Sequence, residues 1–159
     1  MAYSYFKTSK LKSIGLRFFT VYGPWGRPDM APYLFVNAAF NKKPIQVFNH
    51  GNQKRDFTYI DDIVQGIWLS ISQFHLVQSA EVFNIGNGAP VGLMQFISEI
   101  ECATGEKLKK SFVDAQPGDV PITFSDTSKL KKTFGYSPCT SLEEGVLQFV
   151  NWYKNYYDI

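Results

Sequence analysis

Residues 14–29 read IGLRFFTVYGPWGRPD, an apolar run that leads directly into a segment rich in glycine and proline. Residues 14–19 carry apolar side chains on both faces, as strands do in a parallel sheet. Glycine and proline are the residues that most often interrupt regular structure, so residues 20–29 are predicted to form a loop. This stretch therefore predicts a strand with a loop directly after it.

Helices and short strands alternate along the rest of the chain. Residues 1–12 contain no complete capping box, which is the usual signal for the start of a helix. We therefore interpret them as the tail of a helix. The capping box Ser141–Glu144 predicts the start of the last helix, and Gly105 predicts the end of another. Helices are predicted at 31–41, 61–74, 93–104, 127–134 and 142–157, and further strands at 44–48, 82–85 and 108–113. The alternation predicts an α/β fold, and three or four short strands predict only part of a sheet.

The composition excludes several classes of protein. The length of 159 residues matches one domain, and a net charge of +2 is too close to neutral to indicate nucleic acid or a membrane surface as a partner. An aromatic content of 16 % argues against disorder, and no apolar run has the length of a membrane span or the flanks of a signal peptide. Cys102 and Cys139 show no metal-binding spacing. They predict a reduced, cytoplasmic setting without a disulfide or a zinc site.

Two short patterns resemble functional motifs but have simpler explanations. Residues 86–92, GNGAPVG, follow a predicted strand and precede a helix, yet they lack the third glycine of a dinucleotide-binding loop at the expected spacing. We interpret them as an ordinary strand–helix turn. Tyr3 and Lys7 have the spacing of a catalytic Tyr-x-x-x-Lys pair. Such a match arises easily by chance in a chain rich in both residues, and no strand with a catalytic Ser or Thr precedes it.

A second informative stretch, residues 54–62, reads KRDFTYIDD. Together with residues 17–30, RFFTVYGPWGRPDM, it resembles the extended short-chain dehydrogenase/reductase family of nucleotide-sugar epimerases, and most closely the UDP-glucuronate 4-epimerases. The resemblance continues through residues 83–87 (FNIGN) and 116–120 (QPGDV) to the last helix. It therefore covers nearly the whole chain, and these long, ordered motifs are far more specific than a single glycine pattern.

The resemblance implies that the chain is the C-terminal, substrate-binding portion of a Rossmann-type α/β fold whose N-terminal dinucleotide-binding domain is missing. In the family, that domain binds NAD and carries the glycine-rich loop and the catalytic Tyr-x-x-x-Lys pair. We expect residues 1–19 to be the end of that domain and residues 20–159 to form the UDP-sugar-binding domain. The chain alone is then expected to have no catalytic residue, no bound NAD and no metal. Its exposed sheet edge predicts self-association, or a need for a separate N-terminal half.

The resemblance also assigns roles to charged residues. Arg55 corresponds to the arginine that binds the diphosphate, and a guanidinium can hold phosphate in a bidentate manner. The alternative is an ion pair with Asp56 or Asp61. Arg27, with the Thr20 hydroxyl, corresponds to the group that holds the glucuronate carboxylate, although a solvated loop arginine is the simpler alternative. Asp29 lines the same loop.

Further substrate contacts are expected at the strand 44–48 and at single positions elsewhere. Gln46, Val47 and Phe48 resemble the strand that packs on the uracil, with an ordinary core strand as the alternative. Phe19 and Tyr22 correspond to residues near the nicotinamide and the sugar in the full-length context. Gln116 stands where related enzymes place a second phosphate-binding arginine, so the diphosphate is expected to depend more strongly on Arg55. His50 and His75 fit no catalytic or metal-binding arrangement, and we interpret both as surface or turn residues.

The family reaction is an epimerisation at C4 of the sugar. The tyrosine of the missing domain removes the C4 hydroxyl proton while a hydride passes to NAD, and the 4-keto sugar then receives the hydride on its other face. Three alternatives stay open: part of a UDP-glucuronate decarboxylase or nucleotide-sugar 4,6-dehydratase, a stand-alone UDP-sugar-binding module, or an inactive remnant.

Overall fold

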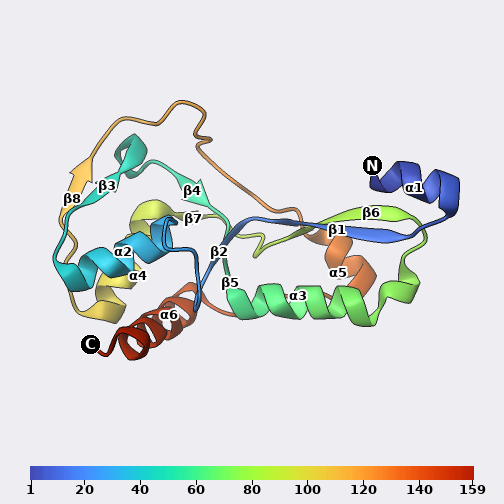
Figure 1. The fold of residues 1–159 in the computed structure, drawn as a ribbon. Helices are drawn as coiled ribbons and strands as arrows, with labels where there is room; N and C mark the ends of the chain where they lie inside the picture. The colour runs from blue at the N-terminus through green and yellow to red at the C-terminus, as the bar shows by residue number, and fades with distance from the viewer.

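The computed structural model describes residues 1–159, and the chain forms two lobes joined by a central pair of short strands (Figure 1). The joining strands are β2 (Thr20–Tyr22) and β5 (Phe57–Tyr59), which pair in parallel. One lobe contains α1 (Ala2–Ser9), β1 (Ser13–Phe18), α3 (Ile60–Ser72), β6 (Ala80–Ile85) and α5 (Ser128–Phe134). The other contains α2 (Ala31–Asn41), β3 (Ile45–Val47), β4 (Lys54–Arg55), β7 (Val91–Gly92), α4 (Leu93–Thr104), β8 (Lys110–Phe112) and α6 (Leu142–Tyr157).

The first lobe is built on the parallel pair β1–β6, in which Arg17 lies opposite Asn84. The predicted parallel strand is therefore confirmed. No residue of β1 is fully buried, however, and Phe18 is 51 % exposed. Only one edge of β1 is paired, since β1 and β6 form a sheet of two strands. A small core of Ile63, Val77, Phe83, Ile85, Leu130, Phe134 and Tyr136 fills the space between this pair, α3 and α5.

Residues 1–19 are not a separate unit in this lobe. Ile14 and Leu16 of β1 pack against the core that α3, β6 and α5 contribute. The domain boundary expected between residues 19 and 20 does not coincide with the boundary between the two lobes, and it stays a prediction.

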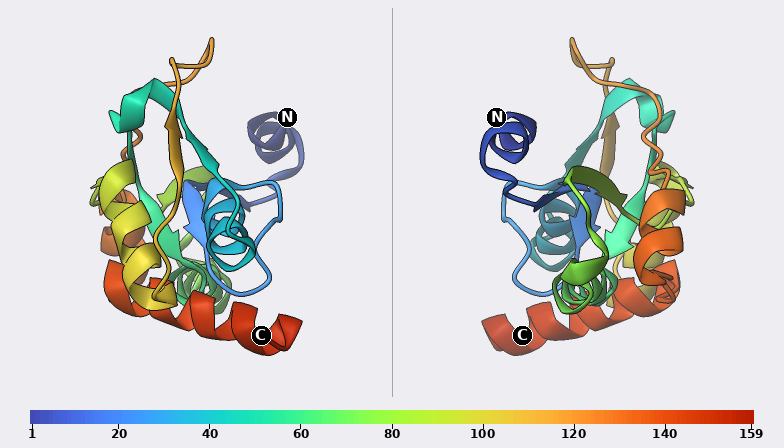
Figure 2. Two further views of the ribbon diagram at one scale, coloured as in Figure 1. Left: turned by 90° about the vertical axis from the view of Figure 1, so that its left-hand side faces the viewer. Right: turned by 90° about the vertical axis from the view of Figure 1, so that its right-hand side faces the viewer.

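The second lobe holds the larger core. Nineteen buried residues from α2, α4, α6 and the strands pack together there. Tyr22 lies at the centre, with its ring edge-on to the rings of Phe57, Tyr59 and Phe96. In the left view of Figure 2, α6 runs along the bottom of this lobe and α4 stands against one end of it, and the two helices pack closely. Each helix buries its apolar residues in this core, among them Phe96 and Ile100 of α4 and Val146 and Phe149 of α6.

The strands are more numerous than the sequence predicts, and those predicted at 44–48 and 108–113 are shorter in the structure. Eight strands form four pairs: β1–β6, β2–β5 and β3–β8 in parallel, and β4–β7 antiparallel. The prediction of a continuous loop over residues 20–29 is wrong at its start, because Thr20–Tyr22 is strand β2. Its partner β5 lies far away in the sequence, and a three-residue strand carries no local periodicity to reveal it.

The helix ends follow the predicted local signals in most places. Gly105 ends α4 with a φ of 75°, the left-handed conformation that glycine adopts without strain. At the start of α6, the Glu144 backbone N–H donates to Ser141 Oγ at 3.1 Å. The cap of α5 involves Asp126, whose Oδ1 accepts from the Ser128 N–H at 3.0 Å. None of the helices has an apolar stretch long enough to span a membrane.

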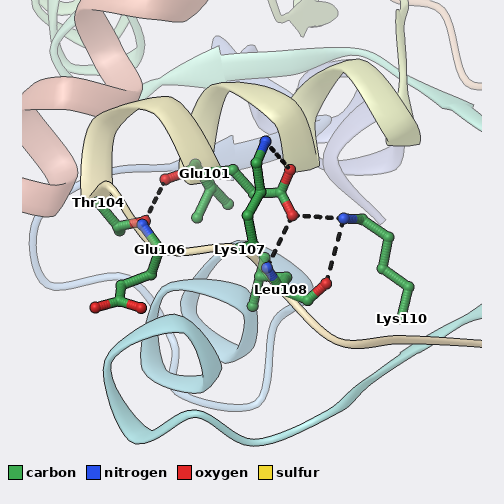
Figure 3. Close-up of polar contacts among 7 residues, drawn as sticks. Glu101, Thr104, Glu106, Lys107, Leu108 and Lys110 are labelled. Carbon is green, nitrogen blue, oxygen red and sulfur yellow. Dashed lines mark hydrogen bonds and ion pairs between the residues drawn. The ribbon is translucent and has the colours of Figure 1, made fainter.

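A buried carboxylate fixes the connection from α4 to β8 (Figure 3). Glu101, only 8 % exposed, accepts from the Leu108 N–H at 2.8 Å and pairs with Lys107 at 3.2 Å and Lys110 at 2.5 Å. Burial alone would raise the pKa of this carboxyl. The hydrogen bonds from Lys110, Leu108 and Lys107 outweigh burial and hold the pKa below its usual value. Charge-assisted hydrogen bonds to Glu101 therefore hold the segment between α4 and β8 in place.

Candidate functional site

A cavity of about 600 Å³ lies in the second lobe, between α2, β3 and β4. Its volume is in the range of sites that bind small molecules. Four predicted substrate residues line it: Thr20, Gln46, Phe48 and Arg55. The remaining wall is mostly apolar and includes Pro32, Leu34, Phe35, Ile45, Phe57 and Leu93. A cavity with apolar walls and one guanidinium suits a ligand that combines a flat apolar part with an anion.

Arg55 is fixed in the wall of this cavity. Its Nη2 donates to Asp119 Oδ1 at 2.9 Å, and its Nη1 donates to the Val120 carbonyl at 2.7 Å. Gln53 donates to the other oxygen of Asp119 at 2.6 Å. The Arg55 side chain is 16 % exposed, so the guanidinium is mostly enclosed and preorganised for an anion. The expected alternative, an ion pair with Asp56 or Asp61, is not what the structure contains.

The predicted uracil-binding strand divides its residues between the cavity and the core. Gln46 is exposed in β3 and lines the cavity, and Phe48 lines it directly after the strand. Val47 is fully buried in the core and does not line the cavity. Successive side chains of a strand point to opposite sides, which explains this division. Gln116 lies exposed in the loop between β8 and α5, outside the cavity wall.

The loop after β2 forms a second cavity of about 450 Å³ with the end of β1. Arg27, Phe19 and Tyr22 line it, whereas Asp29 does not. Arg27 and Asp29 instead bind each other, with Nη2 and Oδ2 at 2.5 Å and side chains 73 % and 63 % exposed. The hydrogen bond from Arg27 lowers the pKa of the Asp29 carboxyl. The pair is therefore charged and open to solvent.

Trp25 shapes this loop by an unusual backbone conformation. Its φ is 60°, in the left-handed region, where a bulky side chain costs about 1–2 kcal/mol. Its ring lies 5.4 Å from that of Trp152 and 5.1 Å from that of Tyr156, both on α6. Aromatic contacts of this kind contribute about 0.5–1.5 kcal/mol each, which is enough to offset the strain. The loop is therefore docked on α6 although Trp25 is 75 % exposed.

The glycine-rich turn at residues 86–92 is occupied by a carboxylate of the chain itself. Asp56 is fully buried and accepts from the backbone N–H groups of Asn87 at 2.9 Å, Gly88 at 3.0 Å and Ser125 at 2.8 Å. A Cβ at Gly86 would lie 2.4 Å from Ser125 Oγ, so glycine is required there by close packing. The N–H groups that would hold a pyrophosphate are therefore used internally. The interpretation of this turn as structural agrees with this geometry, and the turn does not fit a dinucleotide.

Tyr3 and Lys7 lie on α1, at the far end of the first lobe from the 600 Å³ cavity (Figure 1). No residue of α1 is buried, and Lys7 Nζ lies 5.3 Å from the centre of the Tyr3 ring. The two residues thus contact each other on an exposed helix and not in either cavity. His50 is exposed and pairs with Asp114 at 3.1 Å, as a surface residue does.

Two residues of the site were not assigned a role from the sequence. Asp119 binds Arg55, and Gln53 binds Asp119. Asp119 falls within the QPGDV motif, so the resemblance marked it without indicating its partner. Arg55 and Asp119 are separated by 64 residues, and no local pattern in the sequence predicts such a contact.

In sequence and fold, the chain is similar to known epimerases. The model of the NAD dependent epimerase/dehydratase family matches residues 1–86, more than half of the chain. A probable UDP-glucuronate 4-epimerase of Rhizobium meliloti is 41 % identical over 99 % of the chain and 51 % of the relative. UDP-glucuronate 4-epimerase 2 of Arabidopsis thaliana is 40 % identical over 99 % of the chain and 39 % of the relative. The chain spans about half the length of the curated relatives it matches.

A solved structure gives the same result for the fold. The UDP-glucuronic acid 4-epimerase of Bacillus cereus, in complex with UDP-glucuronic acid and NAD, superposes with a TM-score of 0.91. It is 35 % identical and covers 98 % of this chain and 49 % of its own. The expected α/β fold of the extended short-chain dehydrogenases is therefore confirmed. The chain belongs to the NAD dependent epimerase/dehydratase family, and it is similar to the UDP-glucuronate 4-epimerases within it.

Proposed function

We propose that this chain is the UDP-sugar-binding part of an NAD-dependent epimerase of the UDP-glucuronate 4-epimerase type. The observation that carries the proposal is Arg55, held by Asp119 and the Val120 carbonyl in the wall of a largely apolar 600 Å³ cavity. A nucleoside diphosphate has the matching chemistry, a flat base and a diphosphate. Similarity to UDP-glucuronate 4-epimerases at about 40 % identity supports the same substrate class.

In this proposal Arg55 binds the diphosphate, and Gln46 and Phe48 form the slot for the uracil. Val47 contributes only through the position of its backbone, because its side chain lies in the core. Thr20 and Arg27 hold the carboxylate of the sugar from neighbouring cavities, since Thr20 lines the 600 Å³ cavity, Arg27 lines the second cavity and Met30 lines both. Asp29 pairs with Arg27 until the sugar arrives. Gln116 adds a hydrogen bond to a phosphate without adding charge.

The residues present do not provide a complete NAD site, so we derive no chemical step through NAD on this chain. Phe19 and Tyr22 are proposed to face the nicotinamide only in a full-length enzyme. Tyr22 is 3 % exposed, and burial raises the pKa of its hydroxyl, so it stays protonated and apolar in character. We further propose that residues 1–19 are the end of a dinucleotide-binding domain and residues 20–159 the UDP-sugar-binding domain. We also propose that the protein works in the cytoplasm, where Cys102 and Cys139 stay reduced.

Calorimetric titration with UDP tests the phosphate assignment. We expect Arg55→Ala to weaken UDP binding by about 1.5–3 kcal/mol, the range of a charge-assisted hydrogen bond, and Arg55→Lys to restore part of this loss. Arg17→Ala, which removes an exposed arginine from β1, serves as the control and is expected to leave UDP affinity unchanged. Arg27→Ala is expected to weaken UDP-glucuronate but not UDP. Equal losses of UDP affinity in Arg27→Ala and Arg55→Ala would show that Arg27 is misassigned.

A further inference from the structure

We propose that Trp25 is a positioning residue for the sugar carboxylate: it docks the loop that carries Arg27 onto α6 and so makes the site selective for an acidic sugar. This inference rests on the proposed function. Trp25 is not placed in contact with the nucleotide, and nothing in the roles of Arg55 or the uracil slot requires it.

The geometry of the loop supports this positioning role. Residues 23–30 connect β2 to α2, and a tight turn within them is closed by the Gly26 N–H, which donates to the Gly23 carbonyl at 3.1 Å. Trp25 lies inside that turn with a φ of 60°. A tryptophan avoids this conformation unless its surroundings fix it. The contacts that fix it here are those with Trp152 and Tyr156.

The surface of α6 that Trp25 contacts is connected to the main core through stacked aromatic rings. Trp152 stacks on Phe149 with their ring centres 5.9 Å apart, and Phe149 is 1 % exposed in the main core. Trp152 also stacks on Tyr156 at 5.3 Å. An aromatic series therefore runs from the core to the surface of α6, and Trp25 is its last member. Docking on this series ties the loop to the main core, to which Phe149 belongs.

Arg27 itself has no comparable contact with the core or with α6. Its guanidinium binds only Asp29, two residues away on the same loop, and it is largely exposed. Its backbone carbonyl accepts from the Met30 N–H at 3.2 Å, again within the loop. The position of the guanidinium relative to the second cavity therefore depends on where the loop as a whole is held. Trp25 and Arg27 both line that cavity.

The consequence concerns specificity rather than overall affinity. A sugar with a carboxylate at C6 can bind a positioned guanidinium in a bidentate manner, whereas its neutral hydroxymethyl counterpart cannot. If the loop is released from α6, the Arg27 side chain samples many positions. Binding an acidic sugar must then order this side chain, and that cost reduces the higher affinity for the acidic sugar. Binding of the uridine and diphosphate, which use the other cavity, is unaffected.

The test compares UDP-glucuronate, UDP-glucose and UDP as ligands of the 159-residue chain in calorimetric titrations. We expect Trp25→Ala to lower the affinity for UDP-glucuronate about tenfold while changing that for UDP-glucose and UDP less than twofold. Trp25→Phe, which keeps an aromatic ring against α6, is expected to restore most of the preference. Tyr156→Ala removes one partner on α6 without altering the loop and is expected to reduce the preference in the same direction.

Trp68→Ala is the matched control, because Trp68 is also an exposed tryptophan, 65 % exposed on α3 in the other lobe. It is expected to leave all three affinities unchanged. Equal losses for all three ligands in Trp25→Ala, or no loss, would overturn the positioning role while the proposed function stands. A wild-type chain that binds UDP but prefers UDP-glucose to UDP-glucuronate overturns the inference as well. Failure of the wild-type chain to bind any of the three refutes the proposed function itself.

Discussion

Replacing Asp56 tests the view that the glycine-rich turn is structural. Its fully buried carboxylate accepts three backbone N–H groups at 2.8–3.0 Å and the Ser125 hydroxyl at 2.5 Å. In Asp56→Asn, one oxygen becomes an NH2 group that faces donors, so one or two backbone donors lose their acceptor. Each unpaired buried donor costs about 1–3 kcal/mol, and we expect a total loss of about 2–4 kcal/mol. That is a large part of the 5–15 kcal/mol that holds a typical domain folded.

Urea unfolding followed by circular dichroism measures this loss. With a denaturant slope of about 2 kcal/mol/M, the midpoint is expected to fall by about 1–2 M. Asp114→Asn is the control, since its side chain is 99 % exposed and such surface changes stay within about 0.5 kcal/mol. If both variants lowered the urea midpoint equally, the hydrogen bonds from residues 87, 88 and 125 to the Asp56 carboxylate would not stabilise the fold as we expect.

Three further predictions concern pH, cofactor and assembly. Because the folded-state pKa of Glu101 is lowered, its stabilisation is fully present above the usual value of 4.5 and is lost as the pH falls through the lower folded-state value. The difference in unfolding free energy between the wild type and Glu101→Gln should therefore be constant near pH 7 and shrink below about pH 4.5; a difference that grew on acidification would contradict this. We also expect no NAD binding and no epimerase turnover by the chain alone, because the N–H groups of Asn87 and Gly88 already bind Asp56 and the exposed Tyr3–Lys7 pair lines neither cavity; calorimetric NAD binding with micromolar affinity would refute this. Finally, the unpaired edge of β1 predicts self-association in light scattering at rising concentration. A single 18.1 kDa species with amide protection along β1 would show that the edge is covered internally.

Features with local causes were predictable from the sequence. The bounds of α2 and α4 were predicted at residues 31–41 and 93–104, where the structure has them. Apolar spacing and, for α4, a terminal glycine act within one or two helical turns, so a short window contains the whole signal. The parallel character of β1 was predictable for the same reason, because its composition alone indicated a strand without a polar face.

Features that depend on distant partners were not predictable. Strands β2 and β5 each have three residues and exist because they pair with each other across 37 residues of chain, from Thr20 to Phe57. Arg55 could be selected as a site residue from its motif, but its partner Asp119 could not, because only the folded chain brings them together. Gln46 lines the cavity and Val47 lies in the core because the cavity is on one side of β3. Which side that is depends on the folded chain and not on the local sequence.

Arg27 and Arg55, the two arginines of the proposed site, differ in how firmly the chain holds them. Arg55 is mostly enclosed and donates to a carboxylate and two backbone carbonyls, so it keeps its position whether or not an anion is present. Arg27 is exposed and pairs only with Asp29, and solvent screens such a pair strongly. A ligand carboxylate can therefore replace Asp29 at little cost, provided that the loop keeps its place on α6. Under the proposed function, affinity for the common nucleotide is expected to depend on Arg55, and discrimination between sugars on the loop.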